Sequence, residues 1–382
     1  MQHAPSNPVS LAARRGALAA WYRRRRRDLP WRRTRDPWAI LVSEAMLQQT
    51  RVEAVVDRFE AFLARFPSPA ACAAAEEEDV LGAWAGLGYY RRARALREAA
   101  RRIAGGGWPR DAAGLRALPG VGPYTAAAVA SIAFGEPVPV VDGNVVRVLA
   151  RVLALEADPT RGAGARAIRQ AAGELLDPGA PGDANQALME LGALVCRPRE
   201  ARCAECPLAP ACRARAAGVP LRWPRLPARP AAIPVVRAAA LLVCPGGSGE
   251  LLFRRVPEGA HNAGLLELPW VELFRGKAGS RARGPGASAT ARARAEAAFR
   301  EAGLPCRLAA WRGSVRHVIT RHRIRVLAWE GTPGSALARR LPPGHAWLAP
   351  AEALEAGVPA ATRKLLELAG GASSPGRVRP PR

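Results

Sequence analysis

Four cysteines stand close together near the middle of the 382-residue chain. They are Cys196, Cys203, Cys206 and Cys212, with the spacing C-x6-C-x2-C-x5-C in a stretch interrupted by prolines. Four thiolates in one compact loop can hold a tetrahedral zinc ion or a [4Fe-4S] cluster. The sequence therefore predicts a metal centre and leaves both occupants open. The other cysteines lack such neighbours and are interpreted as core residues: Cys72, Cys244 and Cys306.

A carboxyl group lies inside a strongly apolar run. Glu44 follows WAILVS and precedes AMLQQT, within residues 38–53. Burial disfavours the charged form of a carboxyl group and raises its pKa. A proton held near neutral pH is what a general acid needs. Glu44 is therefore a candidate catalytic acid, and the alternative is a partly exposed helix residue beside the capping Ser43.

A tight corner, LPGVGPYTA at 118–126, separates two alanine-rich helical runs. Gly120 and Gly122 let backbone amides approach a ligand, and Pro123 suits the first turn of the next helix. Exposed amides at a helix N-terminus bind phosphate. A second carboxyl group, Asp142, precedes another helical run, so it is either a helix N-cap or a functional group.

The elements that must position these residues are helices. Apolar residues recur at helical spacing from residue 8 to 218, for example at 55–66 and 126–134, with glycine and proline at the corners. Strand patterns are nearly absent from this part. We therefore expect an all-α domain at 8–218.

The composition changes after residue 218. The proline-rich stretch 219–234 predicts an extended linker that cannot sustain a helix. Residues 235–368 are expected to form a smaller α+β domain, and 369–382 a disordered tail. The expected strands are 235–244, 250–256 and 322–331, and the expected helix is 287–303.

The chain carries 57 basic and 32 acidic residues, a formal net charge of +25. This excess favours a polyanionic partner, because neutralising phosphates releases counterions. No apolar run approaches the roughly 20 residues that a membrane span needs. We expect a soluble protein, and either nucleic acid or an anionic membrane surface would fit as its partner.

The cysteine loop and the hairpin about 70 residues before it resemble the endonuclease III superfamily of helix-hairpin-helix DNA glycosylases. The resemblance covers roughly residues 20–215. It implies one [4Fe-4S] cluster in the loop 196–212, and DNA phosphate contacts at Gly120 and Gly122.

Residues 43–50 further resemble the SE-x-MLQQT motif of adenine-specific, MutY-type members. This implies that Glu44 protonates the departing adenine and activates water. It also implies that Asp142 stabilises the positive charge on the sugar, while Asn144 orients that carboxylate or contacts the backbone. Further DNA or substrate contacts are implied at Trp31, Arg32, Gln48, Gln49, Thr50, Leu87, Tyr89 and Gln186, the last against the adenine edge.

Tyr124 stands where bifunctional members of the superfamily carry a lysine. A lysine amine attacks the sugar and forms a Schiff base. A phenol cannot form that intermediate, and the only lysines are Lys277 and Lys364. The resemblance therefore implies a monofunctional glycosylase that uses water.

Residues 235–368 resemble the Nudix-related domain that MutY-type enzymes use to recognise 8-oxoguanine, with 262–270 matching a family turn. The segment 299–303 lacks the paired glutamates of a Nudix hydrolase, so pyrophosphate hydrolysis is not expected. The lesion-recognising tip falls on Ile319, Thr320 and Arg321, which replace the family's Phe-Ser-His. Discrimination between 8-oxoguanine and guanine is therefore less firmly implied than adenine removal.

The sequence thus predicts a multi-domain DNA glycosylase of base excision repair. Its substrate would be double-stranded DNA in which adenine is mispaired with 8-oxoguanine or guanine. The resemblance also implies a cytoplasmic, nucleoid-associated monomer with no membrane partner. Two alternatives remain open at this point: a bifunctional endonuclease III-like glycosylase/lyase for oxidised pyrimidines, and a non-catalytic iron-sulfur DNA-binding protein.

Overall fold

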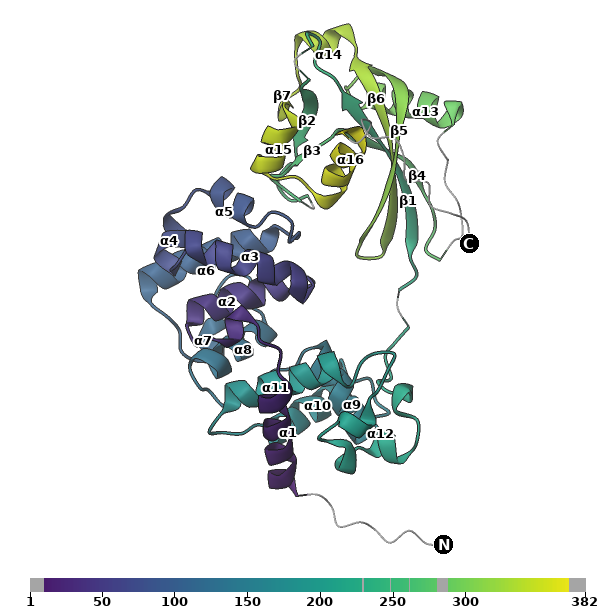
Figure 1. Ribbon diagram of the computed structural model, residues 1–382. Helices are drawn as coiled ribbons and strands as arrows, with labels where there is room; N and C mark the ends of the chain where they lie inside the picture. Colours follow the sequence, from purple (N-terminus) through teal and green to yellow (C-terminus); the bar gives the residue numbers. More distant parts are fainter. Residues whose placement is uncertain (1–9, 229, 248, 261, 280–287, 371–382) are drawn as a thin grey trace. The chain divides into compact units, whose positions relative to one another are not determined.

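The computed structural model describes residues 10–228, 230–247, 249–260, 262–279 and 288–370 (Figure 1). The chain divides into two compact units. Unit 1 combines Met1–Glu77 with Arg92–Ala228, and unit 2 combines Glu78–Arg91 with Arg229–Arg382. The division after Ala228 lies inside the predicted linker, whereas the grouping of Glu78–Arg91 with the C-terminal residues was not predicted.

Unit 1 is helical, as predicted. Local sequence determines where its helices begin: Asp36 caps α2 by accepting hydrogen bonds from the amides of Trp38 (3.2 Å) and Ala39 (3.1 Å), and Pro37 occupies the first turn. The helices and 3-10 turns from the N-terminus through the linker are α1 (Leu11–Arg25), η1 (Pro30–Arg32), α2 (Pro37–Leu47), α3 (Val52–Arg65), α4 (Pro69–Ala74), α5 (Glu77–Ala83), α6 (Arg91–Gly106), α7 (Ala112–Leu115), α8 (Pro123–Ala133), α9 (Gly143–Leu153), α10 (Gly162–Glu174), α11 (Pro181–Leu194), η2 (Cys203–Glu205), η3 (Ala209–Ala211), α12 (Arg213–Ala216) and η4 (Pro220–Arg222).

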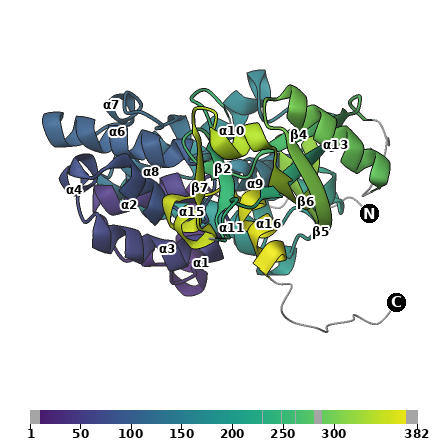
Figure 2. The same ribbon diagram turned by 90° about the horizontal axis from the view of Figure 1, so that it is seen from above.

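The helices of unit 1 form two groups, α2–α4 with α6–α8 and α1 with α9–α12 (Figures 1 and 2). Helix α2 is buried along almost its whole length, and it packs against α3 and α8. In the second group, Leu18 and Trp21 of α1 pack with Leu149 of α9 and Leu188 of α11. The two groups therefore place α2 and α8 opposite α9 and α11.

The start of the predicted linker is not extended, which corrects that prediction. Residues Pro220–Arg222 form a 3-10 turn, and Trp223 is buried at 5% exposure. Its backbone carbonyl accepts a hydrogen bond from Nε of Arg151 at 3.0 Å. Proline content predicted no long helix here, but it could not reveal this tertiary contact.

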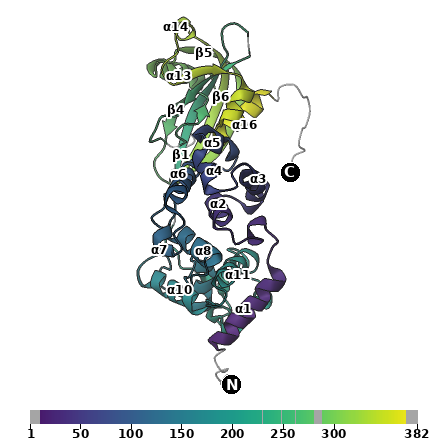
Figure 3. The same ribbon diagram turned by 90° about the vertical axis from the view of Figure 1, so that its left-hand side faces the viewer.

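Unit 2 contains two sheets and flanking helices, which confirms the predicted α+β class. The four-stranded sheet has the order β4-β1-β6-β5, and the three-stranded sheet has the order β3-β2-β7. Helices α13 and α16 cover opposite faces of the larger sheet (Figure 3). The elements are β1 (Ile233–Leu242), β2 (Leu251–Arg255), β3 (Leu266–Glu267), β4 (Trp270–Arg275), α13 (Ala289–Glu301), β5 (Cys306–Ile319), β6 (His322–Pro333), α14 (Ser335–Arg339), β7 (His345–Leu348), α15 (Pro350–Ala356) and α16 (Ala360–Gly370).

The predicted strands correspond to β1, β2 and β6, and the predicted helix to α13. Residues 369 and 370, assigned to the disordered tail, instead end α16. The remainder of that tail lies outside the described residues. The likeness to the Nudix fold stays a prediction.

Candidate active site

A cavity of about 250 Å³ lies within unit 1, between α2 and α8 on one side and α9 and α11 on the other. This volume far exceeds the roughly 15 Å³ that a single water needs. The cavity brings together side chains that are distant in sequence. The predicted site residues that line it are Trp31, Arg32, Glu44, Thr50, Tyr124, Asp142, Asn144 and Gln186.

Glu44 is one of the buried acids that line the cavity. Its exposure is 5%, and its Oε2 atom has no hydrogen-bond partner in the described part of the chain. Burial raises the pKa of Glu44 to about 7, with the neighbouring Asp142 adding to the rise and Tyr124 and Arg32 opposing it. Glu44 therefore holds a proton near neutral pH and has an oxygen free to meet a ligand.

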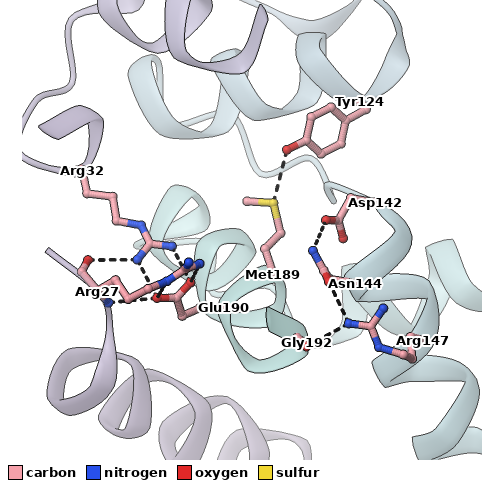
Figure 4. A network of polar contacts seen from close by, with 9 residues as sticks. All are labelled: Arg27, Arg32, Tyr124, Asp142, Asn144, Arg147, Met189, Glu190 and Gly192. Carbon is pink, nitrogen blue, oxygen red and sulfur yellow. Dashed lines mark hydrogen bonds and ion pairs between the residues drawn. The ribbon is translucent and has the colours of Figure 1, made fainter. Parts of the chain in front are cut away.

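Asp142 is both a helix cap and a cavity residue, so the two sequence interpretations are compatible. Its Oδ1 accepts a hydrogen bond from the amide of Val145 at 2.7 Å, and its Oδ2 accepts one from Nδ2 of Asn144 at 2.7 Å (Figure 4). Burial raises its pKa, opposed chiefly by these hydrogen bonds. Asn144 is held in turn, because its Oδ1 accepts from Nη2 of Arg147 at 2.7 Å.

Arg147 was not among the predicted site residues. Its guanidinium also donates to the backbone carbonyls of Gly192 (2.8 Å) and Cys196 (2.7 Å). It therefore fixes Asn144 against the end of α11 and against the first cysteine of the cysteine loop. Helical spacing could have suggested it, since Arg147 lies one turn after Gly143 on α9.

Tyr124 extends from the first turn of α8 toward the cavity, where its hydroxyl donates to Sδ of Met189 at 3.5 Å (Figure 4). Burial, reinforced by Glu44 and Asp142, raises the pKa of this phenol well above its usual range. The hydroxyl therefore keeps its proton and can donate a hydrogen bond. No lysine lines this cavity among the described residues.

Glu190 is the main site residue that sequence reasoning missed. It accepts from Nη1 and Nη2 of Arg32, both at 2.8 Å, and from Nη2 of Arg27 at 2.7 Å (Figure 4). Burial alone would raise the pKa of Glu190, but these donors outweigh it and lower the pKa to about 2. The position of Glu190 four residues after Gln186 places both on the cavity side of α11, a pattern that could have indicated it.

The two hairpin glycines have different structural roles. Gly120 adopts φ +74°, and a Cβ there would lie 2.6 Å from Cβ of Ala95. Gly122 has an ordinary φ of −83°, caps α8 and would meet nothing within 4 Å. The first glycine is therefore required by the fold, whereas the second leaves open space beside the first amides of α8.

The last turn of α2 and the residue after it are held by the buried Arg92. Its side chain donates to the backbone carbonyls of Ala45 (2.8 Å), Met46 (2.9 Å) and Gln48 (2.5 Å). Gln48 also donates through Nε2 to Oγ1 of Thr125 at 3.3 Å. Gln49 is exposed in a left-handed conformation, φ 58°. The turn thus presents Gln49 outward beside the cavity.

The remaining predicted contacts are not brought to this cavity. Leu87 is buried and Tyr89 half-buried, and both lie in the part of Glu78–Arg91 that groups with unit 2. Ile319, Thr320 and Arg321 lie where β5 turns into β6. Thr320 has φ 50°, and it and Arg321 are exposed.

All four clustered cysteines line one cavity beside α9. Burial raises the pKa of Cys206 to about 12 and also raises that of Cys212, so these thiols ionise readily only beside a cation. Nη1 of the buried Arg151 donates to Sγ of Cys196 at 3.2 Å. In the described part of the chain, no three Cys, His, Asp or Glu side chains are placed to hold a metal ion as they stand.

The helix-hairpin-helix corner and the carboxyl-lined cavity define the protein class. The sequence profile of the HhH-GPD superfamily of base excision DNA repair proteins matches residues 42–175. A thermostable thymine-DNA glycosylase has a similar structure, with a TM-score of 0.50 and 30% identity, over 54% of this chain and 98% of that chain. In the described residues, no helix is long and apolar enough to span a membrane.

Closer relatives specify the family. The adenine DNA glycosylase of Mycolicibacterium smegmatis is 47% identical over 207 residues, which cover 53% of this chain and 70% of the relative. The human adenine DNA glycosylase is 48% identical over 219 residues, which cover 54% of this chain and 40% of the relative. The chain belongs to the adenine DNA glycosylase family, although the match spans less than half the length of the human protein.

Proposed function

We propose that this chain removes adenine from duplex DNA by hydrolysing the N-glycosidic bond, and that it acts on adenine paired with 8-oxoguanine or guanine. The observation that carries the proposal is the buried Glu44, whose pKa is raised to about 7 and whose Oε2 is free, on the same cavity as Asp142. Membership in the family supports adenine as the base. The enzyme would act as a monomer on chromosomal DNA in the cytoplasm.

The chemistry needs one acid, one charge-stabilising group and water. The flipped adenine accepts the Glu44 proton, the bond between base and sugar breaks, and the electron pair leaves with the base. The carboxylate of Asp142 stabilises the positive charge that develops on the sugar. Glu44, now ionised, takes a proton from the water that adds to the sugar, which restores the acid.

The decisive experiment is single-turnover adenine release by Glu44→Gln. We expect release to be abolished while duplex binding stays nearly intact, because the amide keeps the shape but cannot supply the proton. Glu53→Gln, at an exposed position of α3, is the matched control and should retain full activity. Full activity in Glu44→Gln would contradict the proposal.

The absence of a lysine from the described cavity wall supports monofunctional chemistry. Borohydride treatment of a reaction mixture should trap no covalent enzyme-DNA adduct, because the phenol of Tyr124 forms no Schiff base. A trapped adduct would favour the bifunctional alternative. Duplex binding without adenine release by the wild-type chain would instead favour the non-catalytic one.

A [4Fe-4S] cluster is the cofactor that we propose for the cysteine loop. Each of its four irons would bind one cysteine thiolate, so the four cysteines would surround the cluster and would not need to converge on a single metal ion. Cys196, Cys203, Cys206 and Cys212 would hold it, and the charge of Arg151 would offset that of the thiolates. When bound, the cluster cross-links the loop. Iron and sulfide analysis with visible absorbance tests this, and colourless, zinc-loaded protein would contradict it.

A further inference from the structure

A buried asparagine joins three of the elements that line the cavity. Asn185 lies on α11 with an exposure of 0%, and its side-chain amide makes three hydrogen bonds. The Nδ2 group donates to Oγ of Ser131 on α8 at 3.0 Å and to the backbone carbonyl of Val138 at 2.9 Å. The Oδ1 atom accepts from the backbone amide of Val140 at 2.9 Å. The side chain thus uses both amide hydrogens and its oxygen, which only one orientation of the amide allows.

The bonds to Val138 and Val140 hold the segment that delivers Asp142. Residues 135–142 connect α8 to α9 and belong to no helix or strand. The backbone of this segment therefore lacks the repeated hydrogen bonds that fix a regular element. Asp142 follows Val140 by two residues, so the bonds to Asn185 constrain the chain directly before the carboxyl group.

The face of α11 that carries Asn185 packs closely against the neighbouring helices. Positions 182, 185, 189 and 192 recur at helical spacing and therefore lie on one face. A Cβ on Gly182 would lie 2.8 Å from Cα of Ile132 at the end of α8, and one on Gly192 would lie 2.6 Å from Cβ of Asn144 on α9. Asn185 lies between these two close approaches, so α11 has little room to shift around it.

The three hydrogen bonds fix the cavity elements relative to one another. Helix α8 carries Tyr124, the segment 135–142 carries Asp142, and α11 carries Gln186. Hydrogen bonds have strict requirements of distance and angle. A buried amide is costly unless its bonds are made, and an apolar side chain would fill the position without this requirement. The asparagine therefore serves the placement of these elements more than the filling of the core.

We propose that Asn185 is a positioning residue for the glycosylase reaction, which holds the segment before Asp142 so that this carboxylate faces the sugar of the extruded nucleotide. The inference rests on the proposed function for the reaction. Asn185 is not among the described residues that line the cavity, so it acts through Asp142 and does not touch the reacting atoms. A misplacement of about 1 Å in such a site can cost on the order of 100-fold in rate.

The pH dependence of adenine release is a readout that a purely structural role would not move. Besides burial, the pKa of Glu44 is raised by Asp142 and lowered by Tyr124 and Arg32. Asn185 carries no charge of its own. When Asp142 moves away from Glu44, the pKa of Glu44 falls, and the rate should begin to decline at a lower pH than in wild type.

The test measures single-turnover adenine release by the saturated full chain as a function of pH. We expect Asn185→Ala to release adenine about 10- to 100-fold more slowly than wild type, with the decline shifted to lower pH. Asn185→Ser keeps a hydroxyl for one of the three partners and should show a smaller loss in the same direction. Duplex affinity should stay nearly unchanged in both variants.

Two further variants separate placement from stability. Val55→Ala truncates a buried side chain of α3, so it should lower the melting temperature and leave the saturated rate and its pH dependence unchanged. Ser131→Ala removes the bond to α8 but neither bond to the segment before Asp142. Its rate should therefore fall less than that of Asn185→Ala.

Three results with the variants would overturn the inference. One is a wild-type rate and pH dependence in both Asn185 variants. Another is a slower rate with an unshifted pH dependence, which would mean that Asp142 has not moved. The third is an equal shift in Val55→Ala, which would assign the effect to a general loss of stability.

Hydrogen exchange in the wild type adds a test that needs no variant. The amide of Val140 should exchange as slowly as the amides inside α8, because its partner Asn185 is fully buried. Rapid exchange of this amide would contradict the proposed hold on the segment. Absence of adenine release by the wild-type chain would instead refute the proposed function, and the hydrogen-exchange result does not depend on it.

Discussion

At the scale of single residues, the cavity holds two glutamates whose pKa values are shifted in opposite directions. Burial dominates at Glu44 and raises its pKa to about 7, whereas arginine donors dominate at Glu190 and lower its pKa to about 2. Divergent pKa values in one cavity are typical of catalytic acid-base sites. The difference arises from partners: Glu44 has an unpaired oxygen, and Glu190 is enclosed by guanidinium groups.

Glu44 should make both the stability and the proposed activity depend on pH, in a direction that its raised pKa determines. Glu44 binds its proton more tightly in the folded state than in the unfolded chain. Between the ordinary pKa of a glutamate and about pH 7, the stability of the fold therefore falls as pH rises. Glu44→Gln cannot ionise, so its stability relative to wild type should increase by on the order of 3 kcal/mol between about pH 4 and 8. Urea unfolding at both pH values measures this.

The same proton predicts the pH-rate profile of the wild type. The single-turnover rate should decline above about pH 7 as Glu44 loses its proton. A rate that is flat to much higher pH would contradict Glu44 as the acid.

Glu190 should show the reverse stability behaviour. Because its pKa is lowered, ionised Glu190 stabilises the fold at pH values above the ordinary pKa of a glutamate. This contribution disappears as pH falls toward about 2. Glu190→Gln should therefore cost on the order of 3 kcal/mol at neutral pH, because Arg32 loses its counter-charge, and less in acid. Glu200→Gln removes an exposed ion-paired carboxylate and should change stability much less. Equal losses in both variants would contradict this account.

At the scale of elements, the hairpin between α7 and α8 contains two glycines with different expected roles. Gly120 is required by the fold, and Gly122 leaves room for a ligand beside the α8 amides. Gly120→Ala should destabilise the fold by about 1–3 kcal/mol, because φ is positive and Ala95 blocks the new methyl group. Gly122→Ala should change stability by less than about 1 kcal/mol but weaken duplex binding, since its methyl group would stand in the open space beside the α8 amides. Thermal unfolding and DNA binding test the pair. Normal DNA affinity in Gly122→Ala would exclude a phosphate at this corner.

Sequence could predict elements better than their tertiary partners. The helical spacing of α3 and α8, the strands β1, β2 and β6, and the apolar surroundings of Glu44 are all local patterns. Arg32 and Glu190, which form an ion pair, are 158 positions apart in the sequence, so no local sequence pattern could predict their contact. The grouping of Glu78–Arg91 with unit 2 is missed for the same reason.

At the scale of the whole molecule, the net charge of +25 should govern binding but not the chemical step. Added salt screens exposed arginines and competes for DNA phosphates, so affinity for undamaged duplex should fall steeply, in proportion to the number of phosphate contacts. Glu44 is buried within unit 1, where screening is weak. The single-turnover rate of fully bound enzyme should therefore stay within about 2-fold over a salt range that lowers affinity by about 100-fold or more. Titrating enzyme to saturation at each salt concentration separates the two quantities. A saturated rate that falls in parallel with affinity would mean that the surface charges assemble the catalytic cavity as well as bind DNA.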